Sequence, residues 1–199
     1  MVDVGNAYDA RAAEYIELLG SVEQMAEQDR ATIGRWQAGI DGDILDAGCG
    51  PGHWTEVLSQ GGAREVRGID ASAHFIASAR RRFPHLDFAR GDLAALPFAS
   101  GSVAGVLSWF SIIHTPPDAV PVILREFARV LAPGGSLLLG FFDGDAGVAF
   151  DHAVTTAYYW SADALGALLA PVGFVVEQAS ARQDPGVRRQ GDLTARVTV

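Results

Sequence analysis

The stretch that most constrains the fold is residues 44–55, which read ILDAGCGPGHWT. An apolar, strand-like run that contains Asp46 leads into glycines at three alternate positions, Gly48, Gly50 and Gly52, after which the pattern becomes helical. Glycines at a strand-to-helix turn allow the backbone to approach a ligand closely, because no Cβ stands in the way. The amides at the start of a helix also favour negative charge. The sequence therefore predicts a nucleotide-like ligand at this turn.

The glycine spacing indicates which nucleotide. In the dinucleotide fingerprint G-x-G-x-x-G, the third glycine allows the helix to pack closely against the strand. If Gly48 and Gly50 were the first two glycines, the third would occupy position 53, where the chain has His53. The pattern Asp-x-Gly-x-Gly-x-Gly therefore disfavours NAD(P). It does not exclude it, because Asp70 follows at the distance that NAD enzymes also use.

Strand-like and helix-like segments alternate along the chain. The apolar or alternating pattern of strands occurs in residues 44–47, 65–70, 86–89, 103–109, 136–142, 173–181 and 193–199. Helical spacing occurs in residues 7–19, 21–37, 53–60, 72–82, 123–131 and 161–170. The alternation predicts an α/β fold with a mostly parallel sheet and helices on both faces. No helix separates the last two strands, so they are expected to form an antiparallel hairpin.

Together these motifs resemble the class I methyltransferases that use S-adenosylmethionine, in particular the small-molecule enzymes of the methyltransferase type 11 group. The resemblance covers about residues 40–199 and includes the segments GDL at 91–93 and APGG at 132–135. It implies a single Rossmann-like domain over residues 1–199, with strand order 3-2-1-4-5-7-6 and the last strand antiparallel. It also implies a helical cap, residues 1–40, over a core of residues 41–199.

The family holds its cofactor at the carboxyl ends of the strands. The cofactor contacts that the resemblance implies at four strand ends are Asp46, Gly48, Cys49, Gly50, Asp70, Ala71, Asp92, Leu93, Ser108 and Trp109. The glycine loop would hold the methionine moiety, Asp70 the ribose diol and Asp92 the adenine amino group. Ser108 and Trp109 would face the methyl group to be transferred. The alternatives are structural, because Asp46 and Asp92 suit turns and Asp70 suits a helix N-cap.

The N-terminal segment carries a second group of candidates. Spacings of three, four and seven residues place Tyr8, Arg11 and Tyr15 on one face of a helix. This resembles a segment that many small methyltransferases fold over the cofactor, so Tyr8 and Tyr15 are expected at the cofactor. Arg11 would meet the cofactor carboxylate or an acidic substrate. A plain amphipathic helix that packs its aromatic residues into the core is the alternative.

The expected acceptor pocket is formed by one residue of the N-terminal segment and by residues that follow the fourth and fifth strands. Its candidates are Arg11, Phe110, His114, Tyr158 and Tyr159. His114 is the candidate general base, because imidazole titrates near neutral pH, although a base is needed only if the acceptor must lose a proton. The alternative for His114 is a loop histidine that hydrogen-bonds to the backbone. The aromatic residues within 143–160 suggest a small, partly apolar acceptor.

Composition argues against some classes of binding partner and indicates a cellular location. A net charge of −9 argues against nucleic acid, and no apolar run reaches the roughly 18–20 residues that span a bilayer. A single cysteine, Cys49, favours the cytoplasm, and no metal site is expected.

The sequence thus predicts methyl transfer from S-adenosylmethionine to a small molecule by in-line displacement, with S-adenosylhomocysteine as the product. The alternatives are an NAD(P)-dependent oxidoreductase and a non-catalytic S-adenosylmethionine-binding module. The identity of the acceptor and the oligomeric state are left open.

Overall fold

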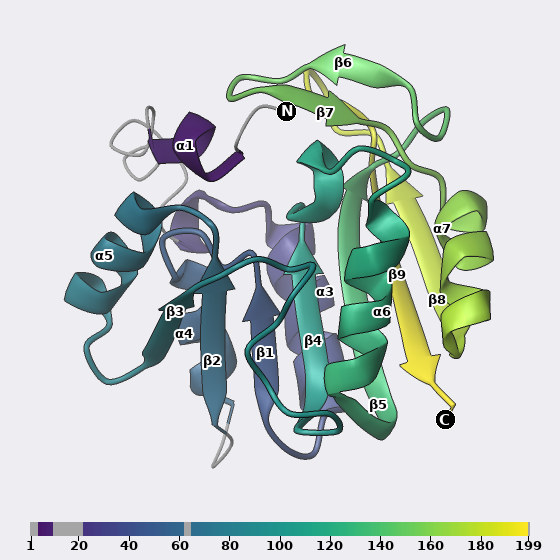
Figure 1. The fold of residues 1–199 in the computed structure, drawn as a ribbon. Helices are drawn as coiled ribbons and strands as arrows, with labels where there is room; N and C mark the ends of the chain where they lie inside the picture. The colour runs from purple at the N-terminus through teal and green to yellow at the C-terminus, as the bar shows by residue number, and fades with distance from the viewer. Residues whose placement is uncertain (1–3, 10–21, 62–64, 199) are drawn as a thin grey trace.

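The computed structural model describes residues 4–9, 22–61 and 65–198. Its main feature is a seven-stranded sheet in the order β3-β2-β1-β4-β5-β9-β8 (Figure 1). These strands are β1 (Ile44–Ala47), β2 (Val66–Asp70), β3 (Asp87–Arg90), β4 (Val103–Trp109), β5 (Leu131–Phe142), β8 (Phe174–Arg182) and β9 (Gln190–Val197). The α-helices are α1 (Val4–Asp9), α3 (Glu27–Ala38), α4 (His53–Ser59), α5 (Ala73–Arg82), α6 (Val120–Val130) and α7 (Ala162–Leu169).

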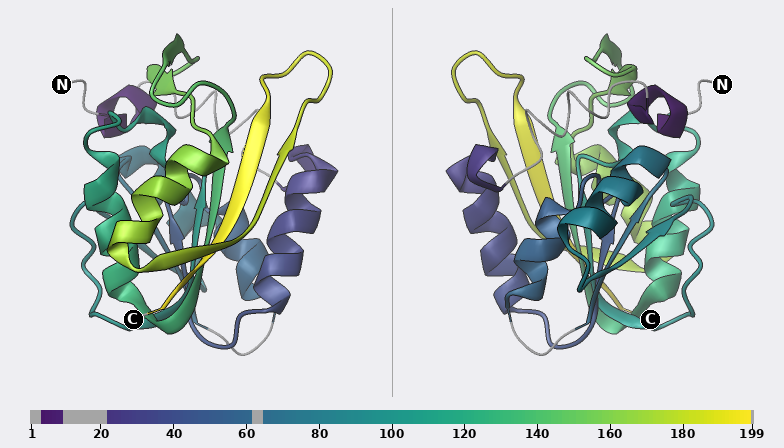
Figure 2. Two further views of the ribbon diagram at one scale, coloured as in Figure 1. Left: turned by 90° about the vertical axis from the view of Figure 1, so that its right-hand side faces the viewer. Right: turned by 90° about the vertical axis from the view of Figure 1, so that its left-hand side faces the viewer.

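The sheet topology confirms the predicted fold class. Strands β1 to β5 pair in parallel, whereas β9 is antiparallel to both β5 and β8. Because β8 and β9 are the sixth and seventh strands of this sheet along the chain, the observed order is the predicted 3-2-1-4-5-7-6. Helices α3 and α4 cover one face of the sheet, and α6 and α7 cover the other (Figure 2).

The core forms where the apolar patterns of strands and helices meet. All four residues of β1 are buried, and α6 turns Ile123, Leu124 and Phe127 toward the sheet, with Phe127 fully buried. On the other face, Trp36 of α3 donates a hydrogen bond from Nε1 to Ser136 Oγ in β5 at 2.9 Å. This buried bond fixes α3 against the middle of the sheet.

Several predicted boundaries differ from the structure. The helix expected over 21–37 is interrupted, because a 3₁₀-helix, η1 (Val22–Gln24), is followed by extended backbone at Ala26 (φ −56°, ψ 143°). Residues 143–160 contain a separate hairpin of β6 (Ala149–Asp151) and β7 (Thr156–Tyr158), and η2 (Ile112–His114) follows β4. A further 3₁₀-helix, η3 (Ala170–Val172), follows α7. Most of the helix expected over 7–19 lies outside the described residues.

The elements at the carboxyl edge of the parallel strands position the site. Helix α1 and the β6–β7 hairpin lie above this edge, at the top of Figure 1. Within the segment predicted as a cap, α1 therefore lies over the sheet edge, whereas α3 packs against the sheet face. In the described part of the chain, no helix has the length and hydropathy needed to cross a membrane.

Candidate active site

A cavity of about 1330 Å³ opens at the carboxyl edge of the sheet. It is bordered by the glycine loop after β1, the turns after β2 and β3, η2, the start of α6 and the β6–β7 hairpin. Most of the predicted site residues line it: Tyr8, Gly48, Cys49, Gly50, Asp70, Ala71, Asp92, Leu93, Trp109, Phe110, His114 and Tyr158. The fold thus brings together residues from both ends of the chain.

Other predicted residues lie elsewhere. Asp46 and Ser108 are buried and are not among the residues that line the cavity. Ser108 Oγ instead hydrogen-bonds to Ser111 Oγ at 2.5 Å. Tyr159 borders a smaller neighbouring pocket and accepts a hydrogen bond from Arg188 Nε at 3.2 Å. Arg11 and Tyr15 lie outside the described residues, so their predicted contacts stay predictions.

Two glycines of the loop have different surroundings, since Gly48 is closely packed and Gly50 has open space beside it. Gly48 has φ +86°, and a Cβ there would lie 2.2 Å from Ser111 Cβ, so this glycine admits η2. Gly50 also has a left-handed φ, +53°, but a Cβ there would meet no atom within 4 Å. Because Gly50 also lines the cavity, its backbone is accessible to a ligand.

Asp70 connects the loops after β1 and β2. Its Oδ2 accepts the Gly50 amide at 2.9 Å and its Oδ1 accepts the Ser72 amide at 2.8 Å. Burial raises the pKa of this carboxyl, which the two amide hydrogen bonds oppose. Each carboxylate oxygen has a second lone pair, so Asp70 can hold the loop and still accept two hydroxyl groups from a ligand.

Asp46 lies beneath the loop rather than in the cavity. Its side chain accepts a hydrogen bond from Thr55 Oγ1 of α4 at 2.7 Å. Burial raises the pKa of Asp46 to about 7, against the opposing effect of Thr55. Asp46 therefore links β1 to α4 on either side of the glycine turn, and its influence on a ligand is indirect.

Asp92 and Cys49 differ in what they can offer a ligand. Asp92 is exposed and its Oδ1 accepts the Ala94 amide at 2.9 Å, which is an Asx turn. The turn leaves Asp92 Oδ2 without a hydrogen bond from the described part of the chain. Cys49 is buried, and burial raises the pKa of its thiol well above the usual value, so Cys49 packs as a neutral thiol.

His114 is held in one tautomer. Its Nδ1 lies 2.8 Å from the carbonyl oxygen of Thr156 in β7, which can only accept, so Nδ1 carries the hydrogen. In the neutral ring Nε2 is then the acceptor, and the Tyr8 hydroxyl donates to it at 2.9 Å. Burial lowers the pKa of His114, against the opposing effect of the Thr156 bond. At neutral pH the ring is therefore uncharged, with its basic nitrogen engaged by Tyr8.

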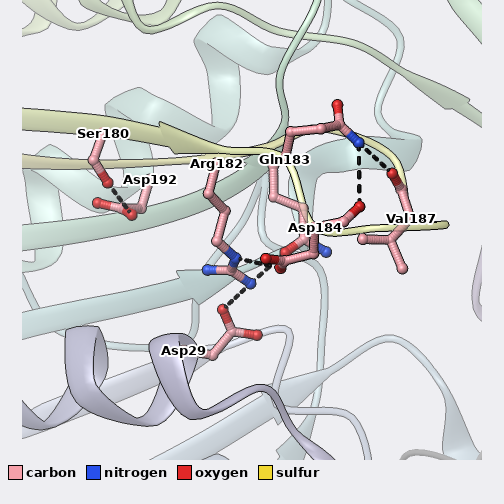
Figure 3. A network of polar contacts seen from close by, with 8 residues as sticks. Asp29, Ser180, Arg182, Gln183, Asp184, Val187 and Asp192 are labelled. Atoms are coloured by element: carbon pink, nitrogen blue, oxygen red, sulfur yellow. Dashed lines mark hydrogen bonds and ion pairs between the residues drawn. The ribbon is translucent and has the colours of Figure 1, made fainter.

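A polar network that sequence reasoning missed borders the side of the cavity near α3. Arg182 of β8 donates to Asp29 Oδ1 of α3 at 2.6 Å and to Asp184 Oδ2 at 2.9 Å, as Figure 3 shows. Arg182 also donates to Gln190 of β9. The guanidinium is thus neutralised by two carboxylates, which ties α3 to the far edge of the sheet.

His53 lines the cavity although it was not predicted there, and Phe110, which was predicted there, has an unexpected backbone conformation. His53 is only 8% exposed, yet neither ring nitrogen has a hydrogen-bond partner among the described residues. Burial, with Arg82 nearby, lowers the pKa of His53 to about 4. Phe110 has φ +54°, which is rare for a residue with a bulky side chain. No sequence pattern marks either feature, because both depend on tertiary contacts.

Comparison with known proteins finds similarity to methyltransferases. Residues 44–135 match the family model described as "Methyltransferase domain". The trans-aconitate 2-methyltransferase of Paracidovorax citrulli is 40% identical over 98 residues, which cover 48% of this chain and 37% of that protein. The chain therefore aligns with well under two thirds of this curated relative's length.

Solved structures agree on the fold along nearly the whole chain. The cyclase SpnF superposes with a TM-score of 0.83 at 19% identity, covering 98% of this chain and 96% of that one. The Burkholderia thailandensis 1,6-didemethyltoxoflavin-N1-methyltransferase, solved with S-adenosylhomocysteine, has a TM-score of 0.77 at 21% identity, covering 98% and 88%. The glycine turn, the strand order and the match over residues 44–135 make this chain similar to the class I S-adenosylmethionine-dependent methyltransferases.

Proposed function

We propose that this protein transfers a methyl group from S-adenosylmethionine to a small-molecule acceptor. The observation that carries the proposal is the meeting of four strand ends in one cavity: Gly50 after β1, Asp70 at the end of β2, Asp92 after β3 and His114 after β4. In open α/β sheets, ligands bind at this edge. The first three residues belong to the cofactor half of the cavity and His114 belongs to the acceptor half.

The cofactor half has the donors and acceptors that S-adenosylmethionine requires. The open face beside Gly50 suits the methionine moiety, and Asp70 has lone pairs for the ribose diol. Asp92 Oδ2 can accept the adenine amino group. When bound, the cofactor supplies a methyl group on a positively charged sulfur and leaves as S-adenosylhomocysteine, with the electron pair of the broken bond on sulfur.

On the acceptor side, His114 can take up the proton that the acceptor loses. Its Nε2 is the basic atom, because Thr156 holds the hydrogen on Nδ1. An acceptor O–H or N–H that replaces the Tyr8 hydroxyl at Nε2 would pass its proton to this nitrogen as the acceptor atom bonds to the methyl carbon. Tyr8 therefore marks the position that the acceptor hydroxyl or amine would take.

The alternatives receive less support. The chain lacks the third glycine of the dinucleotide fingerprint, and the β8–β9 hairpin completes the methyltransferase sheet, which disfavours an NAD(P) oxidoreductase. A non-catalytic binding module, or another reaction on the same fold as in the cyclase SpnF, calls for a direct test. The cytoplasmic location and the lack of nucleic-acid or membrane partners stay predictions from the sequence.

The test is a turnover assay with S-adenosylmethionine and a library of small acceptors. We expect S-adenosylhomocysteine to form together with a product that has gained a methyl group in place of hydrogen, and His114→Gln to slow this reaction. Cofactor binding without any methylated product would favour the binding module. A product with a new ring and no added methyl would favour a cyclase.

A further inference from the structure

We propose that the acceptor is an uncharged, planar aromatic or heteroaromatic molecule that presents an O–H or N–H to His114. This inference rests on the proposed function and names the substrate class of the same site. It is carried by the side chains that line the acceptor half of the cavity and by the placement of every charged group around it.

Five rings form a continuous wall in this half, here called the aromatic wall: Tyr8, His114, His152, Phe142 and Phe110. Neighbouring ring centroids are 5.5, 4.9, 5.8 and 5.0 Å apart in that order. The ring planes cross at 49–75°, so no pair is stacked face to face. Offset and edge-to-face contacts with such rings favour a flat π-system over a saturated ligand of the same size.

The conformation of the wall is held by the backbone. Phe110 keeps its left-handed φ while its amide donates to the Gly140 carbonyl at 3.0 Å. For a bulky residue this conformation is strained, and such strain is concentrated at functional sites. The Thr156 carbonyl fixes His114 from the β6–β7 hairpin. The wall is thus a preorganised surface that joins two loops.

No charged side chain belongs to the aromatic wall. The charged residues lining the described cavity are Asp29, Asp70, Arg90, Asp92, Arg182 and Asp184. Arg182 is paired with Asp29 and Asp184, and Arg90 Nε donates to the Ala71 carbonyl at 3.0 Å beside the cofactor half. Among the described residues, a buried carboxylate or phosphate on the acceptor would therefore meet no cation at the aromatic wall. Burying an unpaired ion is strongly unfavourable.

Three probes, each with one hydroxyl group, separate the two elements of this proposal. They are naphthol, hydroxynaphthoate, which adds one carboxylate, and decahydronaphthol, which is saturated and not planar. Each is titrated calorimetrically into the protein saturated with S-adenosylhomocysteine, after binding of S-adenosylhomocysteine alone has been measured. We expect naphthol to bind roughly tenfold or more tightly than either of the others.

Two matched variants locate the effect. Phe142→Leu removes a ring of the wall, and we expect it to weaken naphthol binding about 2- to 12-fold while S-adenosylhomocysteine affinity is unchanged. Phe150→Leu is the control, because Phe150 packs against Phe142 and Tyr159 but does not line the cavity. We expect Phe150→Leu to leave naphthol affinity within twofold of the unmodified protein.

The outcomes distinguish this inference from the proposed function. If S-adenosylhomocysteine binds but naphthol does not, or if hydroxynaphthoate or decahydronaphthol binds as tightly as naphthol, the acceptor class is wrong while the cofactor assignment stands. Equal weakening by Phe142→Leu and Phe150→Leu would also contradict the role of the wall. If S-adenosylhomocysteine itself does not bind, the proposed function fails first.

Discussion

Substitution of Asp46 by asparagine tests the electrostatics beneath the glycine loop. Asp46 is 2% exposed, and burial raises its pKa to about 7, compared with 3.8 for an exposed aspartate. Between these two values the folded protein retains a proton that the unfolded chain releases. The contribution of Asp46 to stability therefore falls as the pH rises through this range.

The size of the effect follows from the two pKa values. Each pKa unit corresponds to about 1.4 kcal/mol, so the contribution of Asp46 to the free energy of unfolding falls by about 4 kcal/mol between pH 3.8 and 7. Between pH 5 and pH 8, this contribution falls by about 2–3 kcal/mol. Asparagine has the same shape as aspartate and does not titrate. The free energy of unfolding of Asp46→Asn should therefore rise by about 2–3 kcal/mol relative to that of the unmodified protein on going from pH 5 to pH 8.

The assay is urea unfolding of both proteins, without cofactor, at pH 5 and pH 8. Comparing the two proteins at each pH is essential, because His53 titrates in the opposite sense. Burial lowers its pKa to about 4, so His53 stabilises less as the pH falls from 6.5 toward 4. The same free-energy difference between Asp46→Asn and the unmodified protein at both pH values would refute a raised pKa for Asp46.

Three further predictions concern the cofactor, the base and the core. Asp70→Ala should weaken S-adenosylhomocysteine binding roughly 10- to 150-fold by calorimetry, from the loss of charge-assisted hydrogen bonds, whereas Asp43→Ala, which removes a carboxylate that contacts Arg67, should not. Tyr8→Phe removes a hydrogen bond to the neutral form of His114, so the acid limb of the rate–pH profile should move to higher pH; an unmoved limb would contradict His114 as the base. Phe127→Ala should cost about 3–5 kcal/mol of stability in urea unfolding, and a loss under 1 kcal/mol would contradict its place in the core.

The sequence predicts most of the fold, because its strongest patterns are local. The glycine turn, the buried run at 44–47 and the alternating end of the chain each identify their element without tertiary information. The hairpin within residues 149–158 could not be predicted in this way, because β6 and β7 have three residues each and show no usable periodicity. The break at Ala26 was missed for a different reason, since a residue with high helix propensity adopts extended backbone there.

The site was less predictable, because its geometry joins distant segments. Tyr8 and His114 are 106 residues apart, and His114 and Thr156 are 42 apart. Residue types alone could nominate His114 as a base, but its tautomer depends on a carbonyl in an unpredicted hairpin. For Asp46 the motif predicted a cofactor contact, but in the structure its carboxylate accepts a hydrogen bond from Thr55.

The central claim is that the cavity at the sheet edge holds S-adenosylmethionine, and calorimetric titration with S-adenosylhomocysteine tests it most directly. NADH and NADPH are titrated in parallel, because the position of Asp70 alone would also suit a dinucleotide. We predict micromolar binding of S-adenosylhomocysteine and no measurable binding of either nicotinamide cofactor. Binding of NADH or NADPH in place of S-adenosylhomocysteine would contradict the interpretation of the glycine loop and move the protein to the oxidoreductases.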